Sequence, residues 1–183
     1  MGLSNSSTGK KVSNNLKDFS NFDFTVAIAG NPNVGKSTIF NGLTGLNQHT
    51  GNWTGKTVEN AVGICIHNNQ KFLLVDIPGT YSLMADSEEE KIARDYIDSN
   101  KANATVVIVD ATLLERNLNL VFQIMNLTKN VIVCVNLLDE AKKKGISVDL
   151  DKLSLLLGVP VVGTIARNCL LYTSPSPRDT ERS

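Results

Sequence analysis

The sequence of 183 residues lacks an excess of either charge and lacks any long apolar run. Lysine and arginine together number 18, as do aspartate and glutamate, so the net charge is zero. That balance argues against broad electrostatic binding of nucleic acid. No run approaches the roughly 18 apolar residues of a transmembrane helix. Lys10 and Lys11 are not followed by an apolar segment, so no secretory signal is predicted.

Cysteine and histidine are also scarce. The three cysteines, Cys65, Cys134 and Cys169, are far apart and form no C-x-x-C motif. This pattern predicts reduced thiols in a cytosolic domain. His49 and His67 have no cysteine or carboxylate at metal-ligand spacing, so both are expected to be ordinary polar residues. Nothing in the sequence indicates an iron site.

Six short apolar runs follow a polar leader. Residues 1–22 are rich in Ser, Asn and Lys and are predicted to be disordered. Each later run has the length of a strand, and most are rich in Val and Ile and lack alternation. Such runs are typical of strands buried on both faces of a mostly parallel sheet. They are residues 24–30, 61–67, 71–77, 104–110, 130–136 and 159–164.

The segments between these runs carry helix signals. Asp86 or Ser87 is a candidate N-cap before an acidic first turn. Gly145 and Gly158 are expected to end two later helices. The alternation of strands and helices predicts an α/β doubly wound domain. A helix over 113–129 is expected to bury one apolar face, formed by Leu118, Val121, Phe122 and Met125.

The last residues, 168–183, do not continue this pattern. Two Ser-Pro pairs and a charged end follow a domain that is otherwise finished. The segment is either a natural disordered tail or, as we favour, a non-native segment, because "CLLYTSPSPRD" looks like translated adapter sequence. The folded domain is therefore expected to span residues 23–167.

The first apolar run leads directly into "GNPNVGKS", Gly30 to Ser37, which fits the phosphate-binding motif G-x-x-x-x-G-K-[ST]. Its glycines allow backbone N–H groups to converge on phosphate oxygens, and the following helix adds its positive dipole end. The alternative is a chance glycine-rich turn before a helix. The residues expected to contact a nucleotide here are Gly30, Asn31, Asn33, Val34, Gly35, Lys36, Ser37 and Thr38, with Lys36 on the β- and γ-phosphates and Ser37 on Mg²⁺.

Two further motifs stand at the ends of later strands. Asp76 and Gly79 belong to "DIPG", where the carboxylate can hold Mg²⁺ and the glycine N–H can meet the γ-phosphate. Asn136 and Asp139 belong to "NLLD", where the Asp139 carboxylate can accept hydrogen bonds from the guanine N1–H and amine, and Asn136 can brace the loop. Taken alone, this second pattern equally describes an Asn N-cap before a helix. Adenine lacks both donors, so Asp139 would select guanine.

These motifs resemble those of translation-factor-related GTPases, and more closely the N-terminal G domain of ferrous iron transport protein B (FeoB). The matching pieces are "AGNPNVGKSTIFNGLTG", "GNWTGKTVE", "DIPGTYSL" and "NLLDEA", and the resemblance covers about residues 24–167. It implies a P-loop NTPase of the Ras-like GTPase type, with a mostly parallel six-stranded sheet flanked by helices. It also implies the cofactors GTP or GDP, Mg²⁺ and K⁺.

The resemblance implies roles for single residues as well. Thr57 matches the switch threonine that closes on Mg²⁺ and the γ-phosphate, so Lys36, Thr57 and Gly79 would act in catalysis. Ser37, Thr57 and Asp76 would hold Mg²⁺. Asn33 matches an asparagine that helps bind K⁺ beside the phosphates, where the cation would stand in place of an arginine finger. The backbone N–H of Ala166 would meet the guanine O6.

Three positions depart from common GTPase motifs. Leu137 stands where N-K-x-D has its lysine, which suggests weak, fast-exchanging nucleotide. Ile165 stands at the expected serine of S-A-[KR]. Thr80 follows "DIPG" where many small GTPases have a water-orienting glutamine. We therefore expect slow intrinsic GTP hydrolysis that K⁺ stimulates.

As implied by the resemblance, the chain would be the soluble head of a Fe²⁺ transporter at the cytoplasmic face of the membrane. Its partners would be guanine nucleotide and the transmembrane part of the same transporter, which this chain lacks; no nucleic acid is expected, and self-association is left open. One alternative is a soluble potassium-dependent GTPase of ribosome assembly or tRNA modification, although those usually show N-K-x-D and lack "GNW-x-G-x-TVE". The other is a nucleotide-gated binding module with negligible turnover.

The stretch "NQHTGNWTGKTVEN", residues 47–60, lies where the first switch of a GTPase is expected. It is poor in core residues, and Gly51 and Gly55 supply hinges for a segment that would order over GTP and loosen after hydrolysis. Trp53 in its centre is either a loosely packed surface aromatic or a functional residue, as a lid over the phosphates or as a contact that passes to the membrane part when the switch changes.

Overall fold

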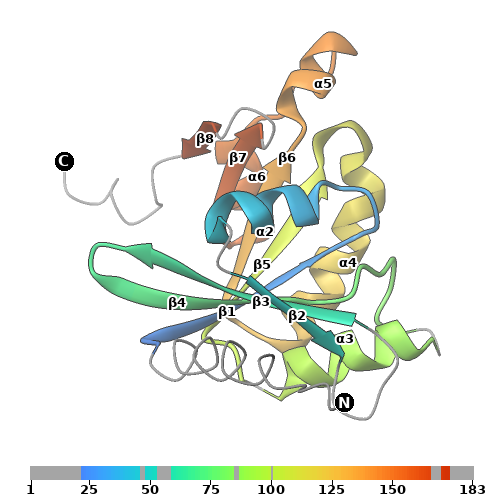
Figure 1. Cartoon of the computed structure of the whole chain (residues 1–183). Coiled ribbons are helices and arrows are strands. Elements are labelled where there is room, and N and C mark those ends of the chain that lie inside the picture. Colours follow the sequence, from blue (N-terminus) through green and yellow to red (C-terminus); the bar gives the residue numbers. More distant parts are fainter. Residues whose placement is uncertain are drawn as a thin grey trace, which may run out of the picture.

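The computed structural model describes residues 22–45, 48–52, 59–84, 87–99, 101–165 and 170–173. Their centre is one eight-stranded sheet in the order β2-β3-β4-β1-β5-β6-β7-β8 (Figure 1). Parallel pairs join β1 to β4 and β5, β5 to β6, and β6 to β7, while the three outer pairs are antiparallel. The strands are β1 (Phe24–Gly30), β2 (Gln48–Asn52), β3 (Glu59–His67), β4 (Gln70–Asp76), β5 (Ala104–Asp110), β6 (Val131–Asn136), β7 (Val161–Ile165) and β8 (Leu170–Thr173).

All six apolar runs of the sequence are strands of this sheet, which confirms the fold class. The sheet has eight strands rather than six because β2 and β8 extend its two edges. Residues 48–52 contain no large apolar side chain, so a search for hydrophobic runs passes over them, and β2 pairs with β3 through its backbone. The strand β8 lies in the segment expected to be disordered or non-native. Its four residues have the β-propensity of an edge strand and pair with β7.

Five α-helices and one short 3₁₀ helix connect the described strands. The side chain of Ser87 accepts from the Glu90 N–H at 3.2 Å, and the Glu90 carboxylate accepts from the Ser87 N–H at 3.3 Å. This capping box identifies Ser87 as the N-cap. Gly145 and Gly158 adopt positive φ after their helices, as expected. The helices are α2 (Lys36–Thr44), α3 (Glu88–Asp98), η2 (Ala111–Leu113), α4 (Leu114–Leu127), α5 (Leu138–Lys143) and α6 (Leu150–Leu157).

The expected apolar face of α4 is confirmed at Val121, which is buried, and at Leu118 and Met125, which pack against the core, but not at Phe122. Phe122 is 51% exposed, so its assignment to the core was wrong. The buried positions repeat at intervals of three and four residues, and they include a polar one, Asn117, whose amide donates to the Leu113 carbonyl at 2.8 Å. Because Asn117 is polar, the apolar pattern alone did not include it in the buried face. The residues buried on α4 are Asn117, Leu120, Val121 and Ile124.

The two faces of the sheet are covered unequally. One apolar cluster contains Ala27 and Val107 and packs against α3, α4, α5 and α6. The other contains Ile28 and Ile108 and packs against α2. Because neighbouring strand residues point to opposite faces, these clusters lie on opposite sides of the sheet. Right-handed crossovers explain the arrangement. From β4 through β5 and β6 to β7 the chain crosses the sheet in one direction, and it moves in the opposite direction only in the connection that leaves β1. None of the helices in the described ranges has the length and apolar character needed to cross a bilayer.

Candidate nucleotide site

The segments that follow β1, β4 and β6 meet at the edge where these parallel strands end. The amide of Asn136, the last residue of β6, donates to the Val34 carbonyl at 2.9 Å. The Thr80 N–H donates to the Gly30 carbonyl at 3.3 Å, which joins the segment after β4 to the one after β1. Ligands of open α/β sheets bind at this carboxyl edge, so three motifs that are far apart in the sequence form one site.

The loop between Gly30 and Lys36 has a shape suited to an anion. Asn33 and Gly35 adopt left-handed φ values of 67° and 86°, and such turns direct successive N–H groups inward. A Cβ on Gly35 would lie 2.4 Å from the Asn136 amide nitrogen, and one on Gly30 would lie 2.7 Å from the Ile108 carbonyl oxygen. Both glycines are therefore required by close backbone packing. The pocket formed here has a volume of about 480 Å³ and is lined by Asn31, Pro32, Asn33, Gly35, Lys36, Ser37, Thr38 and Gly79.

The residues of this loop contribute in different ways. The side chain of Val34 lies in the apolar core, so only its backbone can face a ligand. Asn33, Ser37 and Thr38 are exposed at the mouth of the pocket. Asn31 is 3% exposed, and its Oδ1 has no hydrogen-bond partner among the described residues. A buried acceptor without a partner beside an anion-shaped loop is unusual in a folded domain and fits a site that is completed by a ligand.

Lys36 and Asp76 form an ion pair across the site. The Lys36 ammonium lies 2.5 Å from the Asp76 carboxylate, and the two side chains are 12% and 19% exposed. The pair connects the first turn of α2 with the end of β4. A phosphate chain and a divalent cation would each offer one of these groups a partner of opposite charge.

Asn136 is fully buried and connects three parts of the site. Besides its bond to Val34, its Oδ1 accepts from the Thr164 hydroxyl at 2.9 Å, at the end of β7. The N-cap of α5 is Leu137, with no side-chain cap bond, so the alternative of an Asn136 N-cap is wrong. Sequence reasoning missed Thr164 as a partner, although its place near the end of the last predicted strand was a usable signal.

Behind Asn136 the interior is closed to water. The Cys134 thiol lies 3.8 Å from the Thr164 hydroxyl. Burial raises the pKa of Cys134 to about 11, and the bond to Thr164 lowers it only in part. The thiol is therefore neutral at physiological pH and unsuited to act as a nucleophile or metal ligand. Cys65 is a free, half-buried thiol.

The residue after Asn136 carries backbone strain. Leu137 has φ 61°, a left-handed value that is uncommon for a residue with a Cβ. This turn directs the chain into α5, and Asp139 lies half-buried in its first turn. A carboxylate in this position is favoured by the helix dipole and stands at the same sheet edge as the phosphate-shaped loop.

The segment after β4 is held by side chains from two helices. The Thr80 hydroxyl lies 2.5 Å from the Ser82 carbonyl oxygen and 3.2 Å from the Glu90 carboxylate, so its one proton is engaged by these acceptors. The Gln123 Oε1 on α4 accepts from the Leu83 N–H at 2.6 Å and from the Ser82 hydroxyl at 3.2 Å. Sequence reasoning did not identify Gln123 or Glu90, because nothing in their spacing marks them as partners of this loop.

Two more residues bound this segment. The Arg116 guanidinium lies 4.5 Å from the centre of the Tyr81 ring, which is a cation–π distance. At the other end, a Cβ on Gly79 would lie 3.6 Å from Pro32, so the "DIPG" turn packs on the phosphate-shaped loop. The loop from Gly30 to Lys36 and the segment after β4 are therefore in contact, but of these two only the segment after β4 is held by side chains of α4.

Several predicted residues lie outside the part of the chain that the structure describes. They are Trp53, Gly55, Thr57, Asp86, Ala166 and Cys169, and the side chain of His49 is outside it as well. His67 is exposed. Within the described ranges, no group of three or more His, Cys, Asp or Glu residues is placed to hold a metal ion.

The sequence profile of the family described as "Ferrous iron transport protein B" matches residues 24–170. The Fe(2+) transporter FeoB of Salmonella typhimurium is 45% identical over 146 residues, which cover 78% of this chain and 19% of that protein. The corresponding transporter of Escherichia coli strain K12 is 44% identical over the same length. The chain thus spans about a fifth of these relatives.

Solved structures of FeoB domains match this chain as well. The G domain of the T. maritima FeoB iron transporter matches with a TM-score of 0.76 and 41% identity, covering 79% of this chain and 89% of that one. The FeoB G-domain from Methanococcus jannaschii matches with a TM-score of 0.72 and 47% identity, covering 82% and 90%. A point mutant of S. thermophilus NFeoB bound to GDP matches with a TM-score of 0.75 and 44% identity, covering 79% and 55%.

Proposed function

Because this chain belongs to the ferrous iron transport protein B family, we propose that it binds guanine nucleotide and hydrolyses GTP as the cytoplasmic domain of a ferrous iron transporter. The observation that carries the proposal is the pocket formed by the loop from Gly30 to Ser37, with the Lys36–Asp76 pair at its end. The GDP bound to the S. thermophilus relative supports the choice of nucleotide. Iron transport belongs to the longer protein and rests on the family alone.

The residues of the site fit a nucleoside triphosphate. The N–H groups of the curled loop and the first turn of α2 would receive the phosphates, and Lys36 would bind the β- and γ-phosphates. Ser37, Asp76 and Thr57 would hold Mg²⁺, which supplies charge neutralisation when bound. Gly79 would meet the γ-phosphate through its N–H. Asp139 and the Ala166 backbone would recognise guanine through its N1–H, amine and O6.

Hydrolysis would be slow and would depend on K⁺. Thr80 is engaged by Ser82 and Glu90, so its hydroxyl is not directed at an attacking water. Asn33, exposed at the mouth of the pocket, would help to hold K⁺ beside the phosphates. The monovalent cation would supply positive charge near the bridging oxygen, where other GTPases use an arginine.

The test of nucleotide choice uses a single substitution. In Asp139→Asn, the amide can donate to the 2-carbonyl of xanthine but no longer accepts both guanine donors. We expect affinity for GDP to fall at least 100-fold while affinity for xanthosine diphosphate rises, measured by fluorescent-nucleotide competition. The matched control, Asp95→Asn on the exposed surface of α3, should bind GDP as the parent does. Unchanged GDP affinity in Asp139→Asn would reject the proposed guanine site.

The test of catalysis is single-turnover GTP hydrolysis with Mg²⁺ in KCl or NaCl. We expect faster hydrolysis in KCl, and we expect Asn33→Ala to remove the difference while GDP affinity stays within about threefold. Equal rates in the two salts would count against the role of Asn33. Tight GTP binding without any turnover would instead favour a nucleotide-gated binding module.

A further inference from the structure

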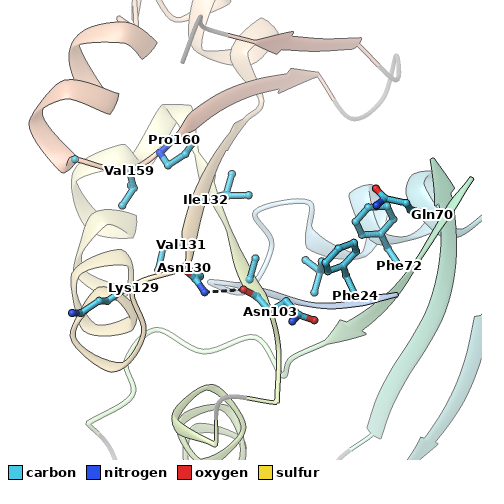
Figure 2. A pocket seen from close by; sticks show the side chains of 13 residues that line it. Phe24, Gln70, Phe72, Asn103, Lys129, Asn130, Val131, Ile132, Val159 and Pro160 are labelled. Carbon is cyan, nitrogen blue, oxygen red and sulfur yellow. Dashed lines mark hydrogen bonds between the residues drawn. The ribbon is translucent and has the colours of Figure 1, made fainter. Parts of the chain in front are cut away.

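The face of the sheet that carries α2 is left open at the opposite end from the nucleotide site. A groove of about 640 Å³ crosses the strands there (Figure 2). The stacked rings of Phe24 and Phe72, with centroids 5.5 Å apart, form one end, and Pro160 forms the other. Val26 and Ile132 line it between them, and although Asn103 and Asn130 also contribute, most of the lining surface is apolar.

The topology explains why this groove is open. Right-handed crossovers place α3, α4, α5 and α6 on the other face, so among the helices of the described residues α2 alone covers this one. A helix of nine residues is about 14 Å long, whereas a seven-residue strand is about 23 Å long. Since α2 starts at the carboxyl edge, beside the phosphate-shaped loop, it ends before the amino-terminal half of the sheet. A segment that covers the groove must therefore come from residues before β1 or after β7.

We propose that residues 12–21 of this chain dock in the groove as a short amphipathic helix. The segment joins the sheet through Phe22, which is 41% exposed, and Phe24, which forms the groove wall. Val12, Leu16 and Phe19 are spaced by four and three residues, so a helix would place them on one face. Ten residues of helix span about 15 Å, close to the roughly 14 Å from β1 across β5 and β6 to β7.

Composition and charge agree with this occupant. The residues between the apolar ones are Ser, Asn, Lys and Asp, which would face water. Lys129, which is among the residues that line the groove, would offer Asp18 a partner of opposite charge. By itself such a segment buries too little apolar surface to fold, which is why its composition predicts disorder. The groove supplies the surface that the free segment lacks.

Other parts of the chain are poorer candidates. After β7 the backbone turns to pair as β8 along the sheet edge, and residues 174–183 contain two Ser-Pro pairs and no large apolar side chain. The family profile matches residues 24–170, so the leader lies outside the matched part of the chain. Its docking is independent of the proposed nucleotide site, which lies at the other edge of the sheet.

Nuclear Overhauser spectroscopy on the full chain tests the contact directly. We expect cross-peaks from the Leu16 methyls and the Phe19 ring to the Ile132 methyls. Random-coil shifts for residues 12–21 with no such cross-peaks would overturn the proposal. Mixed labelled and unlabelled chains separate contacts within one molecule from those between two, and purely intermolecular cross-peaks would assign the groove to a second copy and overturn it equally.

A paired substitution provides the second measurement. Leu16→Asp with Phe19→Asp should lower the thermal midpoint by about 3 °C or more and speed amide exchange in β1 and β6. Leu3→Asp, in the same leader but outside the proposed helix, should change neither. GDP affinity should stay within twofold in both variants. No difference between the paired variant and Leu3→Asp would contradict docking.

Discussion

Two loops line the candidate nucleotide site, and they are held in different ways. The loop from Gly30 to Lys36 depends on its own backbone conformation and on one buried amide, that of Asn136. The segment from Ile77 to Met84 depends on side chains that reach it from α3 and α4, chiefly Glu90 and Gln123. The first loop is therefore fixed with the sheet, while the second can be released by breaking a few polar contacts.

This difference matches the tasks of the two loops. A loop that receives phosphates should be preorganised, because ordering it on binding would reduce affinity. A loop that senses the γ-phosphate must have a second arrangement close in free energy. Hydrogen bonds from partly exposed side chains contribute about 1 kcal/mol each, which is small enough for a nucleotide to offset. The contrast predicts that substitutions at the first loop affect binding and those at the second affect hydrolysis.

The largest effect is expected from Gly35→Ala. The new Cβ would meet the Asn136 amide nitrogen at 2.4 Å, and the φ of 86° disfavours any residue with a Cβ. Strain and displacement of the buried amide together should cost about 3 kcal/mol of unfolding free energy and reduce nucleotide affinity at least 100-fold. Urea unfolding and fluorescent-nucleotide titration measure both quantities.

Gly42→Ala is the matched control for this substitution. It lies in the same helix as Lys36, and a Cβ there meets nothing within 4 Å. Because alanine is the better helix former, we expect a gain of up to about 1 kcal/mol. Equal losses in the two variants would mean that α2 as a whole, rather than the loop, is sensitive.

Asn136→Ala should follow in size. The substitution leaves the Val34 carbonyl and the Thr164 hydroxyl without the partners that Asn136 gives them in a fully buried place. Unsatisfied buried groups of this kind cost about 1–3 kcal/mol, so unfolding free energy and nucleotide affinity should both fall. Asn126→Ala, on the exposed side of α4, should be close to neutral in urea unfolding. A neutral Asn136→Ala would remove the basis for calling the first loop fixed.

The features of the first loop could be predicted from the sequence, whereas the contacts that hold the second loop could not. The six apolar runs and the glycine positions of the first loop follow from local periodicity and from backbone conformations that glycine alone adopts readily. Asn136 was placed correctly at a strand end, and its role as a brace between loops required only that parallel strands end together. Gly35 illustrates the limit of that reasoning: its place in the motif was plain, but the 2.4 Å approach to Asn136 is visible only in three dimensions.

Contacts that cross between elements could not be predicted. Gln123 lies 40 residues from Leu83 in the sequence, and no spacing rule connects them. Asn117 is buried because its amide finds partners in the turn before α4, whereas its polarity suggested exposure. The strand β2 pairs through its backbone at one sheet edge, so its side chains left no strong signal, whereas the apolar residues of β8 at the other edge were set aside with the tail. In each case tertiary context decided the outcome.

Gln123→Leu should have a moderate effect that is confined to the second loop. It removes the acceptor for the Leu83 N–H and the Ser82 hydroxyl. We expect amide exchange at Leu83 to rise about tenfold, in line with a bond of about 1.4 kcal/mol, and single-turnover hydrolysis to slow severalfold. GDP affinity should remain within twofold, since GDP has no γ-phosphate for this loop to sense.

Gln123→Glu keeps an acceptor at the same position and should restore exchange and hydrolysis to near the parent values. Asn119→Leu, on the exposed surface of the same helix, controls for added apolar surface. If Gln123→Leu weakened GDP binding as much as hydrolysis, the two loops would not be separable. The distinction drawn between them would then fail.

The smallest effect is expected at the Arg116–Tyr81 contact. The guanidinium lies 4.5 Å from the ring centre, but Tyr81 is 48% exposed, so the interaction should contribute only about 0.5 kcal/mol. A double-mutant cycle with Arg116→Gln and Tyr81→Leu, read by amide exchange at Ser82 and Leu83, isolates that coupling. Arg94→Gln on α3, paired with Tyr81→Leu, should show none. A coupling energy near zero for Arg116 would mean that hydrogen bonds from Gln123 and Glu90 alone hold the second loop. A coupling energy above about 1 kcal/mol would make α4 as important to the second loop as Asn136 is to the first loop.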